Sequence, residues 1–168
     1  MALIWKEYTE PNSMVEEWLK DADVKKFVNI DCFYDHYKAI INGANNIVDE
    51  NGNVELEYIQ GKNYFVYMIY DESELVGIIE IYNPLCVCTI IIAPKHRNKG
   101  LGTAILKDLI KDTQKYIPNP TSFDLGYIGA VIDNDNIASI KMFEKAGFEE
   151  KLIIDEKTKS YYCPKPLD

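Results

Sequence analysis

The sequence lacks several features that define whole classes of protein. No segment offers about 18 continuous apolar residues, so no membrane-spanning helix is predicted. The first ten residues, MALIWKEYTE, lack the basic start and apolar run of a signal peptide. Positive charge is also scarce: 18 Lys and Arg stand against 27 Asp and Glu, which disfavours a nucleic-acid-binding protein. We therefore expect a cytoplasmic protein that binds neither membrane nor nucleic acid.

Cysteine and histidine are few as well. Of the four cysteines, Cys86 and Cys88 lie two residues apart, and strand alternation places both on one face. No second Cys or His pair follows at the spacing of a zinc finger, so the sequence predicts no metal site. Buried free thiols in a reducing compartment are the better interpretation.

The chain does contain enough apolar and aromatic material for one folded unit. Its 168 residues, 47% hydrophobic with 12 tyrosines, predict a single domain over 1–168 with a buried core. Periodicity and turn residues predict strands at 2–8, 63–70, 75–82, 86–92, 123–132, 148–154 and 160–163, and helices at 11–28, 31–41, 100–113 and 136–146. The polar segment 42–53 is predicted to be a loop.

Details of these elements give testable expectations. Met14, Trp18 and Leu19 are expected on one face of the first helix, and Leu101, Ile105 and Leu109 in line on the third. Pro118-Asn119-Pro120 is expected to stop the third helix, and Gly147 the fourth. The segment from Cys86 to Ile132 is a strand-helix-strand unit, so its two strands are predicted to be parallel.

A glycine-bearing turn joins one apolar strand to the helix after it. It consists of Arg97-Asn98-Lys99-Gly100-Leu101-Gly102-Thr103. The first turn of a helix has unpaired N–H groups and a partial positive charge, which suit an anion such as a pyrophosphate. Glycine permits positive φ and a close approach of backbone to ligand. The spacing matches neither the P-loop nor the GxGxxG pattern, which disfavours an ATP or NAD site.

Two interpretations of this turn compete. Gly100 and Gly102 alone indicate no more than a tight connection between strand and helix. The cations Lys95, His96, Arg97 and Lys99 beside them, in an acidic chain, favour anion binding.

The turn belongs to a longer pattern, and a second pattern follows it. The first is Ile90-x-Ile92-x-Pro94-x-x-Arg97-x-x-Gly100-x-Gly102, and the second is Asn136-x-x-Ser139-x-x-x-Phe143-Glu144-Lys145-x-Gly147-Phe148. Together they resemble the acetyl-CoA signature of the GNAT N-acetyltransferase superfamily, over roughly 75–163. The segment WLKDADVKKF more weakly resembles the opening of ribosomal-protein N-terminal and aminoglycoside 6′-N-acetyltransferases. The implied fold is an α/β (α+β) domain with a mixed, mostly antiparallel sheet flanked by helices and a parallel strand pair at the cofactor cleft.

The resemblance also implies a site for acetyl-CoA as cosubstrate, without a metal. Backbone N–H groups of 97–102 would hold the pyrophosphate, and the pantetheine arm would lie along 90–92 like an added strand. Asn136 would hydrogen-bond the arm, and as a preferred N-cap it can serve the following helix as well. The implied cofactor residues are Ile90, Ile91, Ile92, Arg97, Asn98, Lys99, Gly100, Leu101, Gly102, Thr103, Asn136, Ser139 and Phe143.

Phe143 departs from the family pattern, in which a tyrosine often protonates the departing CoA thiolate. A phenyl ring cannot donate a proton, but a thiol pKa of about 8.5 makes the thiolate a tolerable leaving group. Water or another tyrosine could supply the proton. Tyr127, on the neighbouring strand, is one candidate, and a core or surface aromatic is the competing interpretation.

Glu80 is the candidate general base. It is the only charge in the run LVGIIEIY, and alternation places it on the face of Val76, Ile78 and Tyr82. A carboxylate among apolar neighbours suits proton removal from an ammonium substrate. A solvated carboxylate, or one paired with a lysine, fits the same pattern.

These residues predict an N-acetyltransferase in which a primary amine attacks the thioester directly within a ternary complex, while an N–H near Ile92 steadies the oxyanion. The acceptor is a small amine such as an aminoglycoside, or a peptide amino terminus. An acyl-enzyme at Cys86 or Cys88 is disfavoured, since no histidine adjoins either. Phe143 favours the alternative of a CoA-binding sensor that has lost its chemistry. A homodimer is common in the family.

Overall fold

The computed structural model describes residues 2–30, 47–48, 54–56, 64–82, 86–117 and 126–164. Seven strands form one sheet in the order β1 (Leu3–Glu7), β4 (Tyr64–Asp71), β5 (Glu74–Tyr82), β6 (Cys86–Ile92), β7 (Tyr127–Asp133), β9 (Thr158–Pro164) and β8 (Glu149–Ile153). The helices are α1 (Ser13–Trp18), α2 (Ala22–Phe27), α4 (Leu101–Lys111), α5 (Thr113–Tyr116) and α6 (Ile137–Ala146), with a short 3-10 turn η1 (Pro94–His96) after β6.

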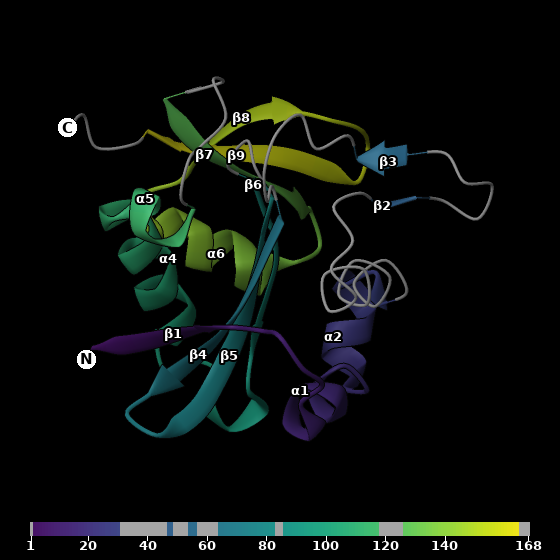
Figure 1. Cartoon of the computed structure of the whole chain (residues 1–168). Helices are drawn as coiled ribbons and strands as arrows, with labels where there is room; N and C mark the ends of the chain where they lie inside the picture. Colours follow the sequence, from purple (N-terminus) through teal and green to yellow (C-terminus); the bar gives the residue numbers. More distant parts are fainter. Residues whose placement is uncertain are drawn as a thin grey trace.

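The sheet is mixed and mostly antiparallel, as the resemblance implied. β6 and β7 are parallel, and the other neighbouring pairs of the described sheet are antiparallel. The helices α4 and α6 lie on one side of the sheet, while α1 and α2 lie on the other (Figure 1). The parallel pair at the centre therefore runs between a layer of C-terminal helices and a layer of N-terminal helices.

The predicted helix at 11–28 is wrong in one respect, because the chain forms two short helices there. The Asp21 carboxylate accepts hydrogen bonds from the backbone N–H groups of Asp23 and Val24, which starts a second helix. The buried face also differs: Val15 and Trp18 point inward, whereas Met14 is 41% exposed. The helix predicted at 31–41 lies outside the described residues.

The polar segment at 42–53 is not wholly a loop. Its residues Ile47–Val48 form the short strand β2, which pairs antiparallel with β3 (Val54–Leu56). Apolar and β-branched residues at these positions favour extended pairing over the turn signals around them.

The third predicted helix ends earlier than expected. α4 ends at Lys111, and Asp112 leaves the helical conformation and caps α5 by accepting from the N–H of Lys115. Pro118-Asn119-Pro120 lies outside the described residues. The predicted buried line of Leu101, Ile105 and Leu109 is confirmed, and Gly147 ends α6 with φ 106°.

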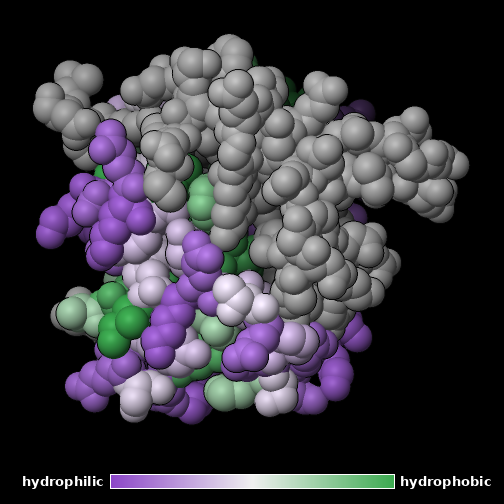
Figure 2. Space-filling model, viewed as in Figure 1, coloured by the Kyte–Doolittle hydropathy of each residue, from purple (hydrophilic) through white to green (hydrophobic). Residues whose placement is uncertain are grey.

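Two apolar clusters fill the two sides of the sheet. The larger packs α4, α5 and α6 against one face, with Ile79, Ile105 and Phe143 among its members. The smaller packs α1 and α2 against the other face, through Trp18 and Ile78 among others. On the face shown in Figure 2, the apolar side chains of the described residues form small patches among hydrophilic ones. No helix in the described ranges is long and apolar enough to cross a membrane.

Candidate active site

The parallel strands β6 and β7 separate soon after they meet. Cys86 pairs with Gly129, and no further pair joins the described residues of the two strands. β6 runs on to Ile92 and β7 to Asp133, so the two strands carry unpaired facing edges toward their carboxyl ends. The resemblance predicts that a pantetheine arm enters at this parting of the sheet.

The facing edge of β6 belongs to Ile90 and Ile92. The N–H of Ala93 donates to the carbonyl of Val76 over 2.9 Å, so Ala93 faces β5. Because backbone groups alternate along a strand, those of Ile92 and Ile90 point toward β7. The backbone of Ile91 faces β5 instead, so Ile91, expected among the cofactor residues, does not offer its N–H or carbonyl to the opening.

The glycine turn forms an open helix start at the end of this edge. Asn98 and Gly100 both have positive φ, 61° and 78°, and Gly100 is the N-cap residue of α4 without a side-chain cap. The N–H of Ala104 donates to the carbonyl of Gly100. The three N–H groups before it, those of Leu101, Gly102 and Thr103, belong to the unpaired first turn. They match the backbone positions expected to hold a pyrophosphate.

Gly102 and Thr103 also serve the packing of α4 on α6. A Cβ added to Gly102 would lie 2.1 Å from Sδ of Met142. The Thr103 hydroxyl donates to the carbonyl of Met142 over 3.3 Å. Gly100 differs, because a Cβ there would meet nothing within 4 Å. Glycine is therefore favoured at the two positions for different reasons: at Gly100 for its backbone conformation, and at Gly102 for the close contact between α4 and α6.

The four cations before the glycines do not form one positive cluster. Lys95 and His96, on η1, both approach the carboxylate of Glu74, with His96 Nε2 at 3.3 Å. These contacts hold the pKa of Glu74 below its usual value. Lys99 is exposed and has no recorded side-chain partner among the described residues. Lys95 and His96 are therefore paired with a carboxylate, and a contact of Lys99 with an anion stays a prediction.

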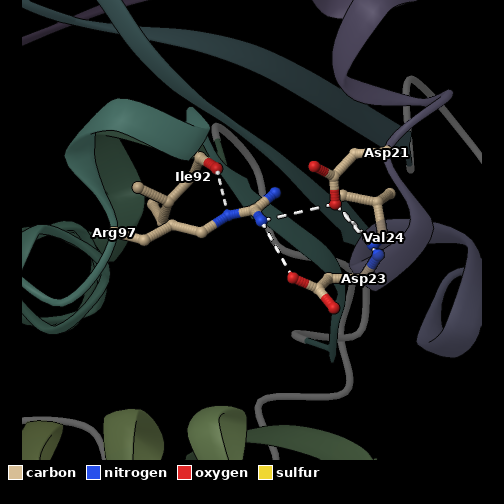
Figure 3. A network of polar contacts seen from close by, with 5 residues as sticks. All are labelled: Asp21, Asp23, Val24, Ile92 and Arg97. Carbon is tan, nitrogen blue, oxygen red and sulfur yellow. Dashed lines mark hydrogen bonds and ion pairs between the residues drawn. The ribbon is translucent and has the colours of Figure 1, made fainter.

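Arg97 turns toward the N-terminal helices (Figure 3). Its Nε donates to the carbonyl of Ile92 over 3.2 Å. Its Nη1 lies 3.3 Å from Oδ1 of Asp21 and 3.4 Å from Oδ2 of Asp23. In this structure the side chain of Arg97 thus joins the edge of β6 to the start of α2.

The second signature segment lies on α6. The side-chain oxygen of Asn136 accepts from the backbone N–H of Ser139 over 3.2 Å, so the N-cap interpretation is confirmed. The amide nitrogen of Asn136 has no recorded partner in the described part of the chain, and its contact with a pantetheine arm stays a prediction. Phe143 is 3% exposed and packs edge-to-face on Phe148, with ring centroids 4.8 Å apart.

Glu80 is buried in the middle of the sheet at 3% exposure. It stands opposite Val66 of β4 and Thr89 of β6, beside a register shift that leaves Cys88 outside the ladder. Ile78 and Tyr82 belong to the apolar cluster under α1 and α2, which puts Glu80 on that side by alternation.

Two predictions around Glu80 and the thiols are corrected. Val76 belongs to the opposite cluster, because a register shift between Ile69 and Tyr70 breaks the alternation of β5 against β4. Cys88 is exposed and Cys86 half-buried, whereas Cys163 is buried as expected. Cys32 lies outside the described residues. No group of metal-ligating side chains occurs in the described ranges.

Tyr127 begins β7, two positions before the pair of Cys86 with Gly129 and thus at the closed end of the parting. It stacks on Tyr162 with centroids 4.4 Å apart. Burial, then the neighbouring Tyr162, raises the pKa of Tyr127, so its phenol is neutral near pH 7. Its role as a proton donor to a thiolate stays a prediction.

No pattern in the sequence predicted Asp21 and Asp23 as partners of Arg97. The prediction of one helix over 11–28 also missed Asp21 as a helix start, although aspartate is a preferred N-cap. Its contact with Arg97 spans 76 positions of sequence, and no local signal specifies such a contact.

Comparison with known proteins places this geometry in a family. The model of the acetyltransferase (GNAT) family matches residues 39–148, more than half of the chain. The chain therefore belongs to the acetyltransferase (GNAT) family, and this membership supports an acetyltransferase enzyme.

Solved structures share the fold over nearly the whole chain. The aminoglycoside acetyltransferase AAC(6')-Ib, in complex with coenzyme A and kanamycin, is 16% identical with a TM-score of 0.66, covering 96% of this chain and 93% of that one. The spermidine N-acetyltransferase from Vibrio cholerae, in complex with CoA and spermine, is 16% identical with a TM-score of 0.62, covering 97% and 95%. The Campylobacter jejuni N-acetyltransferase PseH, in complex with acetyl coenzyme A, is 15% identical with a TM-score of 0.59, covering 98% and 99%.

Proposed function

We propose that the protein transfers an acetyl group from acetyl-CoA to a primary amine of a small polycationic molecule. One observation carries the proposal: β6 and β7 part after Cys86 and Gly129, and the uncapped start of α4 follows the open edge of β6. An extended arm can pair with such an edge while its anionic end meets the helix N-terminus. The family membership supports the same cosubstrate.

The residues present fit acetyl-CoA. The N–H groups of Leu101, Gly102 and Thr103 suit the pyrophosphate, and the exposed ammonium of Lys99 adds charge beside them. The edge of β6 offers the N–H and carbonyl of Ile90 and the N–H of Ile92 to the amides of the arm. Asn136 supplies a further amide donor at the start of α6.

The chemistry assigned to the chain is proton removal and charge stabilisation. An alkylammonium has a pKa of about 10.4 and must lose a proton before it attacks a thioester. We assign the acceptance of that proton to Glu80, a carboxylate buried on the side of α1 and α2. The cleft-facing N–H of Ile92 or Ile90 can stabilise the oxyanion. The departing thiolate takes its proton from water or a tyrosine, since Phe143 cannot supply one.

The acceptor class is proposed from charge and from the structural neighbours. The chain carries a net charge of -9, which favours the approach of a cationic substrate. The neighbours named above include complexes with kanamycin and with spermine. A peptide amino terminus remains the second candidate acceptor, for which the described residues offer no particular support.

A panel assay tests both halves of the proposal. Release of free CoA thiol from acetyl-CoA is measured with kanamycin, spermine, spermidine and an N-terminal peptide, and calorimetry measures acetyl-CoA binding alone. We expect binding, and thiol release with at least one of the three polycationic amines. Release with the peptide alone would reassign the acceptor.

The alternative function, a CoA-binding sensor, rests on Phe143 in the core at the usual tyrosine position. It predicts acetyl-CoA binding without thiol release for every amine in the panel. A Glu80→Gln variant separates the two further. We expect it to keep acetyl-CoA affinity and lose turnover about 100-fold or more, in the range typical of general-base removal. Unchanged turnover in Glu80→Gln would remove Glu80 from the chemistry.

A further inference from the structure

Arg97 is the only arginine in the chain, since the other basic residues are lysines and two histidines. It occupies the arginine position of the acetyl-CoA signature, where its charge is expected to serve the cosubstrate. The guanidinium instead contacts Ile92, Asp21 and Asp23 (Figure 3). An ammonium is a compact point charge, whereas a guanidinium presents five donors in a planar fork and can reach several acceptors at once.

The three acceptors belong to two different walls of the site. The carbonyl of Ile92 lies on the edge of β6 that faces β7, as the alternation from Ala93 establishes. Asp21 and Asp23 lie at the start of α2, whose buried residue Val24 packs in the same apolar cluster as Ile78 and Ile91. Arg97 therefore spans from the cosubstrate edge to the helices that cover the face bearing Glu80.

The contact with Asp21 is partly shielded from water. The side chains of Arg97 and Asp21 are 27% and 26% exposed, whereas that of Asp23 is 87% exposed. The Oδ1 atom of Asp21 also accepts from the N–H groups of Asp23 and Val24, so the carboxylate is held by its own helix. Salt screens an exposed pair strongly and a partly buried pair less, so Asp21 is the stronger partner of the two.

We propose that Arg97 is a positioning residue for the amine acceptor: it holds the start of α2 against the edge of β6 and is not a ligand of the pyrophosphate. The carbonyl of Ile92 that it occupies is withdrawn from the pantetheine arm, and the N–H of Ile92 stays available. Loss of the bridge releases α2 from β6 and lowers acceptor affinity, while the anion site at the start of α4 is retained. The acceptor part of this role rests on the proposed function.

The test compares charge-removing variants that keep local structure. Asp21→Asn removes the charge and keeps a good N-cap, so α2 itself is preserved. Arg97→Gln removes the charge, and Lys99→Gln is the matched control at the cation expected to face the phosphates. KM for the amine that the wild type acetylates is measured beside the dissociation constant of acetyl-CoA by calorimetry.

We expect Arg97→Gln and Asp21→Asn each to raise the amine KM about tenfold, because a displaced wall misplaces the acceptor. The affinity of these two variants for acetyl-CoA should change less than about threefold. Lys99→Gln, in contrast, should weaken acetyl-CoA binding and leave the amine KM unchanged. In the double variant the amine KM should again rise about tenfold, since coupled partners are not additive. If the amine KM of the double variant rises about 100-fold, the two residues act separately and the proposed bridge between Arg97 and Asp21 is rejected.

The opposite pattern would also overturn the proposal. If Arg97→Gln weakens acetyl-CoA more than tenfold and leaves the amine KM unchanged, Arg97 serves the anion. Should Arg97→Gln not fold, Arg97→Lys replaces it, because a point charge cannot span both Ile92 and Asp21 and should raise the amine KM likewise.

A stability measurement separates this inference from the proposed function. Urea midpoints of the wild type, the two single variants and the double variant test the coupling of Arg97 with Asp21 without any substrate. A wild type that binds no acetyl-CoA would reject the proposed function and leave this measurement valid. Additive midpoint shifts would reject the bridge even in an active enzyme.

Discussion

The helices α4 and α6 follow the two strands that part, and they begin in opposite ways. α4 starts at Gly100 with φ 78° and no side-chain cap. α6 starts at Asn136, whose side chain satisfies the N–H of Ser139. Both helices are amphipathic and both pack on the same face of the sheet. The difference lies in their first turns: α4 has no side chain that caps its first N–H groups, and α6 satisfies one of its N–H groups with the side chain of Asn136.

Because of this difference, we expect the start of α4 to contribute mainly to cosubstrate binding and the start of α6 mainly to stability. A helix that starts at glycine forgoes roughly a few tenths of a kcal/mol of stability relative to a side-chain cap, and its unpaired N–H groups suit an anion. The capped start of α6 fixes the chain where it leaves β7 and still has an amide nitrogen to offer. Changes at α4 should therefore affect cosubstrate binding first, and changes at α6 should affect folding first.

The largest effect is expected from Gly100→Glu. A carboxylate at the open helix start repels a pyrophosphate, and we expect acetyl-CoA affinity to fall about 100-fold or more, equal to roughly 3 kcal/mol. Gly100→Ala is the matched control, because a Cβ meets nothing within 4 Å and only the strain of positive φ, about 1 kcal/mol, is added. Calorimetry with acetyl-CoA measures both. Equal affinity in wild type and Gly100→Glu would take the turn out of the site.

The contact between the two helices is probed by Gly102→Ala. The new Cβ would lie 2.1 Å from Met142 Sδ, the end of a flexible side chain, so the helices must shift or the methionine must move. Alanine favours a helix over glycine by about 1 kcal/mol, so we expect Gly102→Ala alone to lower the free energy of unfolding by no more than about 1 kcal/mol. In a Met142→Ala background the contact is absent, and the same change should raise the free energy of unfolding by about 1 kcal/mol. Urea unfolding measures the set, and an equal effect of Gly102→Ala in the two backgrounds would contradict the close contact.

The capped helix start is probed by two changes at Asn136. Asn136→Ala should lower the free energy of unfolding by about 1 kcal/mol through loss of the bond to Ser139. Asn136→Asp keeps the accepting oxygen and removes the amide donor. We expect it to preserve stability and to raise KM for acetyl-CoA. If both variants lose the same stability, the cap contributes through something other than the accepting oxygen.

The smallest effect concerns α2, which begins with a charged cap. Burial alone would raise the pKa of Asp21, but the N–H groups of Val24 and Asp23 and the charge of Arg97 outweigh it and lower the pKa below 3.8. The unfolded chain therefore takes up a proton at higher pH than the folded chain does. The stabilising contribution is present above about pH 4, and it is lost as pH falls through the lower folded pKa.

Asp21→Asn should abolish the part of the pH dependence of stability that comes from Asp21. The difference in urea midpoint between wild type and Asp21→Asn is expected to shrink from pH 7 to pH 3. A difference that stays constant over that interval would show that the charge of Asp21 does not stabilise the fold.

Local patterns were sufficient for most elements. The strand Cys86–Ile92 has its predicted bounds, and the helix ended by Gly147 was predicted within one residue at its start. The long-range contacts were different. Neither the turn of Arg97 toward Asp21 nor the pairing of Lys95 and His96 with Glu74 could be read from the residues that precede the glycines. Contacts of this kind depend on which carboxylates the folded chain brings within reach.

The pairing register of neighbouring strands decided on which face of the sheet the side chains around Glu80 lie. Strand alternation predicted the face of Glu80 correctly against Ile78 and Tyr82, and failed at Val76, where β5 gains a residue against β4. Such a register shift is a property of a pair of strands, so it cannot be predicted from the sequence of one strand alone.

The sequence by itself determined the glycine turn, its order before the Asn136 segment, and hence the family. These depend on backbone conformation and hydrogen bonding within a few residues, which residue type controls directly. Only the tertiary structure decided which edge of β6 faces the opening, how far β7 stays paired with it, and that the chain's single arginine holds α2 rather than standing free beside an anion. Those outcomes depend on distances between segments far apart in the chain, which packing sets.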